Sequence, residues 1–179
     1  DDVVMRMNLF RSQLYEAGTK IKPDLLTFDG MPSVWDTGAS FGLTPFRDDF
    51  IEYHECSVPV KDVSKVNKVI GMGIVIEKYR ATNGDYCYVP QIKYHLPSAE
   101  IRLSSPQSYH QRWGGWSYLN GDVVIMHLPQ QPHLAVQHEI AIPIERDGSN
   151  LPMVYNVAST REEREELGPK FRTTFARHS

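Results

Sequence analysis

The stretch VWDTGASFGLTPF, residues 34–46, places a single carboxylic acid between an apolar pair and a run of small residues. Asp36 is followed by Thr37, Gly38 and Ala39. The threonine supplies a short hydroxyl donor, the glycine permits close backbone approach, and the alanine adds little bulk. A tight turn with such donors can orient a carboxyl group and control its pKa, as acid–base chemistry requires. The pattern therefore predicts a turn that presents Asp36 for chemistry, with an ordinary Asx-turn in a surface loop as the alternative.

Short β-strands are expected around this turn. The Asp29-Gly30 pair predicts a hairpin between strands at 25–28 and 32–35, directly before Asp36. Two Asn-Gly pairs, at 83–84 and 120–121, predict further hairpin turns. Because Val, Ile, Tyr and Thr dominate as far as about residue 155, the chain is expected to be mainly β. The remaining strands are expected at 56–60, 69–80, 86–94, 101–103, 123–128 and 140–144.

Helical signals stand outside these strands. Ser105 is expected to cap a short helix that ends at 114–115. Ser159 and Glu162 stand at capping-box spacing and predict a highly charged helix that ends at 168–169. We expect three regions, namely an N-terminal helix and linker at 1–23, a main domain with extra β-hairpins at 24–155, and a charged C-terminal helix and tail at 156–179.

Composition narrows the class of protein. The chain has 179 residues, of which 41% are apolar and 23% charged, as in a globular protein. Its 19 basic against 22 acidic residues lack the positive excess that nucleic acid binding requires, and no apolar run is long enough to span a bilayer. We therefore expect no nucleic acid and no membrane as partners. The N-terminus does not show the residue pattern of a secretory signal.

Metal and disulfide chemistry are not expected. Cys56 and Cys87 lie far apart without a CxxC pattern, which favours free thiols in a reducing compartment. The histidines match no compact ligand set. We therefore expect the protein to bind no metal and no cofactor.

The acid-containing stretch resembles a known active site. VWDTGAS resembles the active-site loop of aspartic proteases, and specifically that of the retropepsins. DTGASFGLTPFRDDFIEY, VNKVIGMGIVIEKY, YHLPSAEIRLSSPQSY and DGSNLPMVY resemble successive blocks of the protease region in copia-type retrotransposon polyproteins, over roughly residues 25 to 155. The resemblance implies a mainly β fold, a retropepsin-like aspartic protease β-barrel with a flap hairpin, short helices and added C-terminal hairpins.

The same resemblance implies an activity. It makes Asp36, Thr37 and Gly38 the catalytic residues of an aspartic endopeptidase, a hydrolase in which two carboxyl groups share a proton. Because this chain holds one Asp-Thr-Gly, a homodimer must supply the second acid, and one Asp36 from each subunit activates water. The expected substrate is an extended segment of a retrotransposon Gag-Pol-type polyprotein, and the expected location is intracellular, in the cytoplasm or in virus-like particles. The alternative is a domesticated or inactive retropepsin-like dimer that binds extended peptides without cleavage.

Further residues are expected to contact the substrate. Residues 59–73 stand where a retropepsin flap falls, with Gly71 and Gly73 as hinges and a plain surface hairpin as the alternative. Ser104 stands where retropepsins have an apolar residue; we expect its hydroxyl to bond to backbone, with altered packing beneath the acid as the alternative. The predicted substrate-binding residues are Ala39, Val66, Ile70, Ile101 and Leu103.

Overall fold

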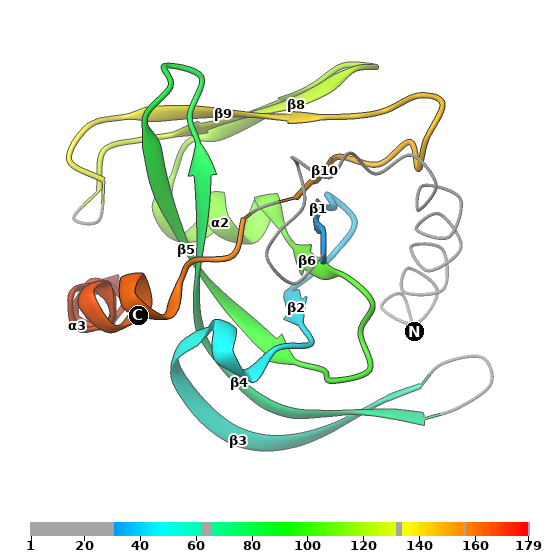
Figure 1. The fold of residues 1–179 in the computed structure, drawn as a ribbon, viewed down its shortest axis with the longest axis vertical. Helices are drawn as coiled ribbons and strands as arrows, with labels where there is room; N and C mark the ends of the chain where they lie inside the picture. The colour runs from blue at the N-terminus through cyan, green and yellow to red at the C-terminus, as the bar shows by residue number, and fades with distance from the viewer. Residues whose placement is uncertain (1–30, 62–65, 132–133, 156, 179) are drawn as a thin grey trace.

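The computed structural model describes residues 31–61, 66–131, 134–155 and 157–178, and within them the protein is mainly β (Figure 1). These residues form one sheet of seven strands and one of three. The strand predicted at 25–28 and the N-terminal helix and linker predicted at 1–23 lie outside the described residues.

The seven-stranded sheet carries the acid-containing stretch. In sheet order its strands are β10 (Met153–Val154), β1 (Ser33–Trp35), β6 (Arg102–Ser104), β2 (Gly42–Thr44), β5 (Tyr86–His95), β4 (Val66–Arg80) and β3 (Phe50–Lys61). The pairs β1/β6 and β2/β5 are parallel, and the other neighbours are antiparallel. Because β6 lies between β1 and β2, the connection that holds Asp36 crosses the end of β6.

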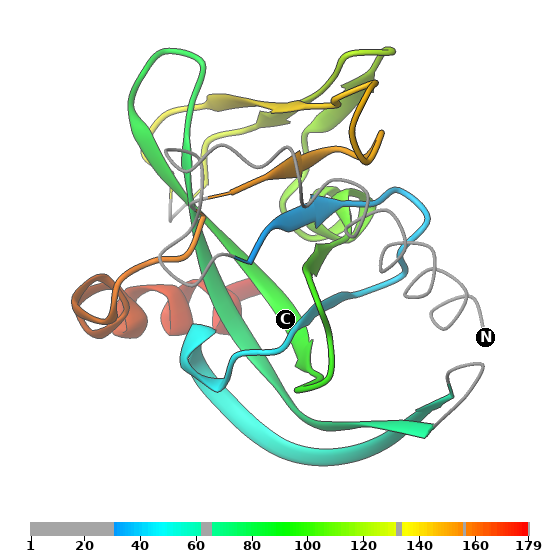
Figure 2. The ribbon, with the colours of Figure 1, turned by 45° about the vertical axis from the view of Figure 1, so that its right-hand side comes forward.

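Three long strands, β3, β4 and β5, extend this sheet through two hairpins. The β4–β5 turn falls at 83–84, as the Asn-Gly pair predicts, and Gly84 adopts the positive φ of 92° that such a turn requires. Strand β3 begins at Phe50, six residues before the predicted strand at 56–60. Together β3 and β4 curve away beneath the rest of the sheet (Figure 2).

The second sheet, formed by β7 (Trp116–Leu119), β8 (Val123–Leu128) and β9 (His138–Pro143), lies across the end of the β4–β5 hairpin (Figure 1). A backbone hydrogen bond joins this hairpin to the second sheet: Thr82 N–H donates to Glu139 O at 2.8 Å. Alternate residues of β8 are buried, which places one face of this sheet on the core. The turn at 120–121 is where the second Asn-Gly pair predicts it, whereas strand β7 was not predicted.

The sequence leads us to expect a β-barrel, but neither sheet closes into one within the described residues. The edge strands of the larger sheet, β10 and β3, are not neighbours. The end of the sheet that holds β10 continues instead toward the second sheet, through a bridge between Ile144 and Pro152. At the other end, β3 pairs only with β4 among the described strands.

Helix α2 (Pro106–Trp113) follows β6 directly and is confirmed as predicted. The Ser105 hydroxyl oxygen accepts a hydrogen bond from the Ser108 N–H, and Pro106 occupies the first helical turn. Gly114 ends the helix with a φ of 81°, a left-handed conformation that favours glycine. A short 3-10 helix, η3 (Arg47–Asp49), precedes β3.

Helix α3 (Arg161–His178) is longer than predicted, because it continues through 168–169. Pro169 lies inside it. Tertiary packing supports the second half of the helix: Phe171 is buried, its ring lies beside that of Tyr88, and the Arg172 side chain donates to Ile51 O at 2.6 Å. These contacts outweigh the hydrogen bond that a proline removes from a helix.

The capping box of α3 is displaced by one residue from its predicted position at Ser159 and Glu162. Thr160 N–H donates to the Glu163 carboxylate at 2.9 Å, and Glu163 N–H donates to the Thr160 hydroxyl at 3.1 Å. Ser159 is buried instead, and its hydroxyl donates to Ile76 O at 3.0 Å. Ser159/Glu162 and Thr160/Glu163 have the same spacing in the sequence. Because the Ser159 hydroxyl bonds to β4, Thr160 and Glu163 form the capping box instead.

Two clusters of buried apolar side chains stabilise this arrangement. The first lies between the two sheets and includes Trp35, Tyr79, Trp113, Met126 and Ile142. The second lies beside the acid-containing connection and includes Val34, Ala39, Leu43, Ile101 and Leu103. Adjacent residues of β1, Val34 and Trp35, therefore enter different clusters, as expected for a strand whose side chains alternate between faces.

Candidate active site

Residues 36–39, which we call the acid turn, begin where β1 ends. Asp36 N–H donates to Ser104 O at 3.0 Å, which fixes the turn to the end of β6. Ala39 N–H donates to Asp36 O, and Gly38 N–H donates to the Asp36 Oδ1 atom, each at 3.0 Å. The carboxylate is thus oriented by its own turn, as in an Asx-turn, while Asp36 stays half-buried and Thr37 is exposed. This combination leaves the acid fixed in place yet accessible.

Helix α2 holds the acid turn from the other side. The Gln107 side-chain amide donates to Thr37 O at 2.8 Å and to Ala39 O at 2.7 Å, and the Ser108 hydroxyl donates to Ser40 O at 3.2 Å. Since both neighbours of the amide nitrogen are carbonyl acceptors, the orientation of the Gln107 side chain is determined. Its Oε1 atom is buried and accepts no hydrogen bond from the described residues.

Sequence reasoning missed Gln107. The sequence feature that could have indicated its role is its position in the first turn of a capped helix that directly follows β6. A polar side chain there reaches the loop that crosses the end of the same strand.

A buried polar network lies behind the acid turn. The Trp35 indole N–H donates to the Tyr79 hydroxyl at 2.7 Å, and that hydroxyl donates to the Glu77 carboxylate at 3.0 Å. Glu77 is only 1% exposed. The donors to its carboxylate come from four strands and are Ser33, Tyr79, Gln91, Lys93 and Ser104.

Lys93 supplies the charge that balances Glu77. The two side chains are 0% and 1% exposed, and Lys93 Nζ lies 3.3 Å from Glu77 Oε2. Burial by itself raises the pKa of Glu77, but the Lys93 charge and the hydrogen bond from Gln91 outweigh it and lower that pKa below its usual value. The carboxylate is therefore ionised in the folded protein.

Ser104 belongs to this network. Its hydroxyl donates to Glu77 Oε1 at 3.3 Å, so the prediction that it bonds to backbone is wrong. The serine is 0% exposed, and its backbone carbonyl accepts the hydrogen bond from Asp36. A hydroxyl is accommodated at this position because a buried carboxylate stands opposite it.

A second buried ion pair ties η3 to β6. Arg102 donates to both carboxylate oxygens of Asp49, at 2.9 and 3.1 Å, and also to Met31 O at 3.0 Å. The Thr44 hydroxyl donates to the same carboxylate at 2.5 Å. Such a two-pronged guanidinium–carboxylate contact fixes geometry as well as charge. It positions β6, on which the acid turn rests, against the segment that enters β3.

The β3–β4 hairpin occupies the position predicted for the flap, and its residues 62–65 lie outside the described residues. A Cβ atom at Gly71 would lie 2.1 Å from the Tyr53 ring, and one at Gly73 would lie 1.9 Å from Glu52 O. These glycines are thus required by close packing between the two strands. That they act as hinges stays a prediction.

The predicted substrate-binding residues fall in different environments. Ala39, Ile101 and Leu103 are buried in the second core cluster, and each residue is at most 6% exposed. Ile70 is 39% exposed, and Val66 pairs with Lys61 at the described end of the hairpin. The structure therefore brings three of the five together in the second core cluster, and the exposed Ile70 is not among them.

A cavity of about 510 Å³ lies near the acid turn, between α2 and β5. Phe41, Tyr94, Ser108, Tyr109 and Trp113 are among its lining residues. None of the predicted site residues lines it.

Among the described residues, no group of three or more His, Cys, Asp or Glu side chains could hold a metal ion. Cys56 and Cys87 are free thiols, as predicted, and burial raises the pKa of Cys87 to about 11. A thiol with that pKa stays protonated at neutral pH and is not a nucleophile there.

Comparisons of the chain with protein-family models, with curated proteins and with solved structures give no match. Across the described part of the chain, none of the helices has both the length and the apolar character needed to cross a membrane. The function of the acid turn has to be argued from its own residues.

Proposed function

We propose that the chain is a retropepsin-like aspartic endopeptidase, active as a homodimer, that processes a retrotransposon Gag-Pol-type polyprotein. The observation that carries the proposal is the acid turn. An Asp-Thr-Gly-Ala sequence follows a buried strand, Asp36 accepts the Gly38 N–H, and Gln107 holds the turn by two backbone carbonyls. An acid held this firmly and left accessible is what a general acid–base catalyst needs.

The order of elements supports the same proposal. The acid turn follows β1, a long hairpin formed by β3 and β4 comes next, and β6 then leads straight into α2. This is the order that the resemblance to the retropepsins implies. We include in the proposal that the seven-stranded sheet belongs to a retropepsin-like fold.

In the proposed dimer, the two Asp36 carboxyl groups lie on either side of the twofold axis and share one proton. The ionised carboxylate accepts a proton from water, which attacks the peptide carbonyl, and the protonated carboxyl group donates its proton to the carbonyl oxygen. Thr37 is exposed and can reach the partner subunit's turn. A single chain holds only half of this site, since it contains one Asp-Thr-Gly.

The primary experiment incubates the purified chain with a precursor that includes its flanking sequence and follows cleavage. Asp36→Asn is expected to abolish cleavage. Asp85→Asn is the matched control, because Asp85 also stands beside a glycine at a turn, but at the exposed tip of the β4–β5 hairpin. Equal processing by the Asp36 variant would exclude this acid as the catalyst.

A mixing experiment tests the dimer. With equal amounts of wild-type chain and Asp36→Asn chain, random pairing places about half of the wild-type chains in mixed dimers, so activity per wild-type chain falls about twofold. An activity per wild-type chain that does not change on mixing would show that one chain suffices. Specific activity is also expected to fall on dilution, since dissociation removes half of the site.

A further arm separates cleavage from peptide binding. A labelled extended peptide is titrated against the wild-type chain and against Asp36→Asn. Equal affinity for the two chains, with no cleavage of the precursor by either, would show that the protein binds extended peptides without cleaving them. Cleavage that depends on Asp36 supports the endopeptidase.

A further inference from the structure

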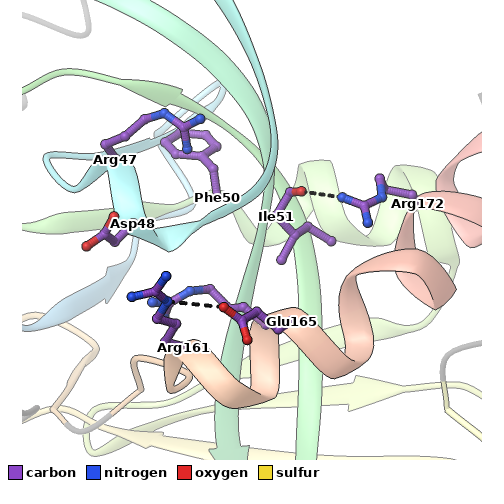
Figure 3. Close-up of a pocket in the computed structure, with 8 residues that line it drawn as sticks. Arg47, Asp48, Phe50, Ile51, Arg161, Glu165 and Arg172 are labelled. Carbon is purple, nitrogen blue, oxygen red and sulfur yellow. Dashed lines mark hydrogen bonds and ion pairs between the residues drawn. The ribbon is translucent and has the colours of Figure 1, made fainter.

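A second pocket lies between η3, the start of β3 and α3 (Figure 3). Its volume is about 540 Å³, which is in the range of pockets that bind small molecules. Four arginines and two acids line it, namely Arg47, Arg161, Arg164, Arg172, Asp48 and Glu165. The pocket thus has a net positive charge in a protein whose formal net charge is −3.

Two of the arginines are held by the protein. Arg172 donates to Ile51 O at 2.6 Å, and Arg164 donates to Ser159 O. Figure 3 shows Arg172 on one side of the pocket, where its bond to Ile51 joins α3 to β3. These contacts fix the walls of the pocket before any ligand binds.

The other two arginines can turn their donors toward a ligand. Arg161 pairs with Glu165 at 3.1 Å, but the two side chains are 81% and 68% exposed, and a pair so exposed contributes little. The Arg47 guanidinium lies 3.9 Å from the centre of the Tyr53 ring. Stacking of this kind uses the face of a guanidinium and leaves the N–H groups at its edge available.

The surroundings of Arg47 are rigid. Phe50 is 7% exposed, and its ring packs edge-on against that of Tyr53 at 5.1 Å between centres. Phe50 and Ile51 also line the pocket and give it an apolar wall. The aromatic pair therefore holds Arg47 at the edge of the pocket opposite Arg172.

We propose that this pocket binds a small ligand that bears a di- or triphosphate group. Guanidinium groups match phosphate oxygens through paired N–H donors, and here they approach from two sides. Asp48 and Glu165 repel anions, so a ligand with a single negative charge gains little binding energy in this pocket. A ligand with several negative charges can contact several of the arginines at once. The proposal does not depend on Asp36, which lies in the acid turn and not in this pocket.

The test is isothermal titration calorimetry of the full chain with sodium tripolyphosphate at low salt. Saturable binding of one ligand per chain is expected, with inorganic phosphate at least about tenfold weaker because it offers fewer charges. The combined variant Arg47→Gln/Arg161→Gln is expected to weaken tripolyphosphate binding at least about tenfold. Arg146→Gln is the matched control and should not change binding, because Arg146 forms a similarly exposed pair with Asp122 outside the pocket.

Glu165→Gln provides a test in the opposite direction. It removes a repulsive charge and releases Arg161, so tripolyphosphate binding should tighten by about fivefold. Asp36→Asn should bind as the wild type does, which separates this proposal from the endopeptidase. Absence of saturable binding, equal affinity for phosphate and tripolyphosphate, or unchanged binding in the double arginine variant would each overturn the proposal. If the double arginine variant does not fold, Glu165→Gln tests the proposal alone, and binding that does not tighten in this variant would overturn it.

Discussion

Replacement of Glu77 by glutamine should destabilise the protein more than almost any other change of similar size. Glu77 is 1% exposed and lies opposite Lys93, which is 0% exposed. Glutamine has the same shape, but it removes the negative charge and places an amide where one carboxylate oxygen stood. Lys93 is then left buried without its charged partner.

The magnitude follows from the contacts. Oε1 of Glu77 accepts from Tyr79, Gln91 and Ser104, and Oε2 accepts from Ser33 and Lys93. A glutamine oxygen can keep one of these sets, whereas its NH2 group would face the donors of the other. Loss of one member of a buried ion pair costs about 3–5 kcal/mol, which is a large part of the 5–15 kcal/mol stability typical of a domain.

A double-mutant cycle isolates the pair. In Lys93→Met the carboxylate keeps four uncharged donors, so a smaller loss of about 1–3 kcal/mol is expected. The double variant Glu77→Gln/Lys93→Met removes both charges and should be more stable than the sum of the single losses predicts, by about 2 kcal/mol.

Urea unfolding followed by tryptophan fluorescence measures these differences, since Trp35 and Trp113 are buried. Asp122→Asn is the control, because its pair with Arg146 is 68% exposed on both sides and should change stability by less than about 0.5 kcal/mol. Additive losses in the cycle, or a stable Glu77→Gln variant, would refute the assigned network.

Three further predictions concern single residues. Gln107→Ala removes both donors to the acid turn and should lower any Asp36-dependent cleavage more than it lowers the melting temperature, which parallel activity and calorimetry measurements compare. Gly73→Ala forces a Cβ toward Glu52 O and should cost about 1–3 kcal/mol in urea unfolding; a neutral result would mean that the strands lie further apart. Burial opposes ionisation of Glu163, but the hydrogen bond from Tyr88 and its other donors outweigh burial and lower its pKa to about 2. Its stabilising effect should therefore be complete above its ordinary pKa of 4.5 and decline toward pH 2, and Glu163→Gln should flatten urea-measured stability over that interval.

Local signals account for the parts of the fold that the sequence predicts well. The hairpin turns at 83–84 and 120–121 and the capped helix after Ser105 depend on residues within one turn of each other. The acid turn is partly of the same kind, since the hydrogen bonds that Asp36 accepts from Gly38 and Ala39 run between neighbours in the chain.

The features that were missed depend on contacts between distant segments. Glu77 stands in a strand between Ile76 and Lys78, and nothing near it in the chain shows that Lys93 will neutralise it. Pro169 reads as a helix stop, yet the buried Phe171 side chain stabilises the helix beyond it. Gln107 is a helix residue whose partners lie almost 70 positions earlier. Burial and long-range partners decide these cases, and single-residue preferences do not reveal them.

The tight contacts at Gly71 and Gly73 bear on how the long hairpin can bend. Tyr53 and the Glu52 carbonyl cover both glycines, so this part of the hairpin is a stiff base with little room to flex. The register of the β3–β4 pair shifts further out, between Glu55 and Val58, where an irregular ladder replaces regular pairing. A bulge bends a strand and weakens its pairing, so any bending of the outer part of this hairpin would occur at this irregular pairing and not at Gly71 and Gly73.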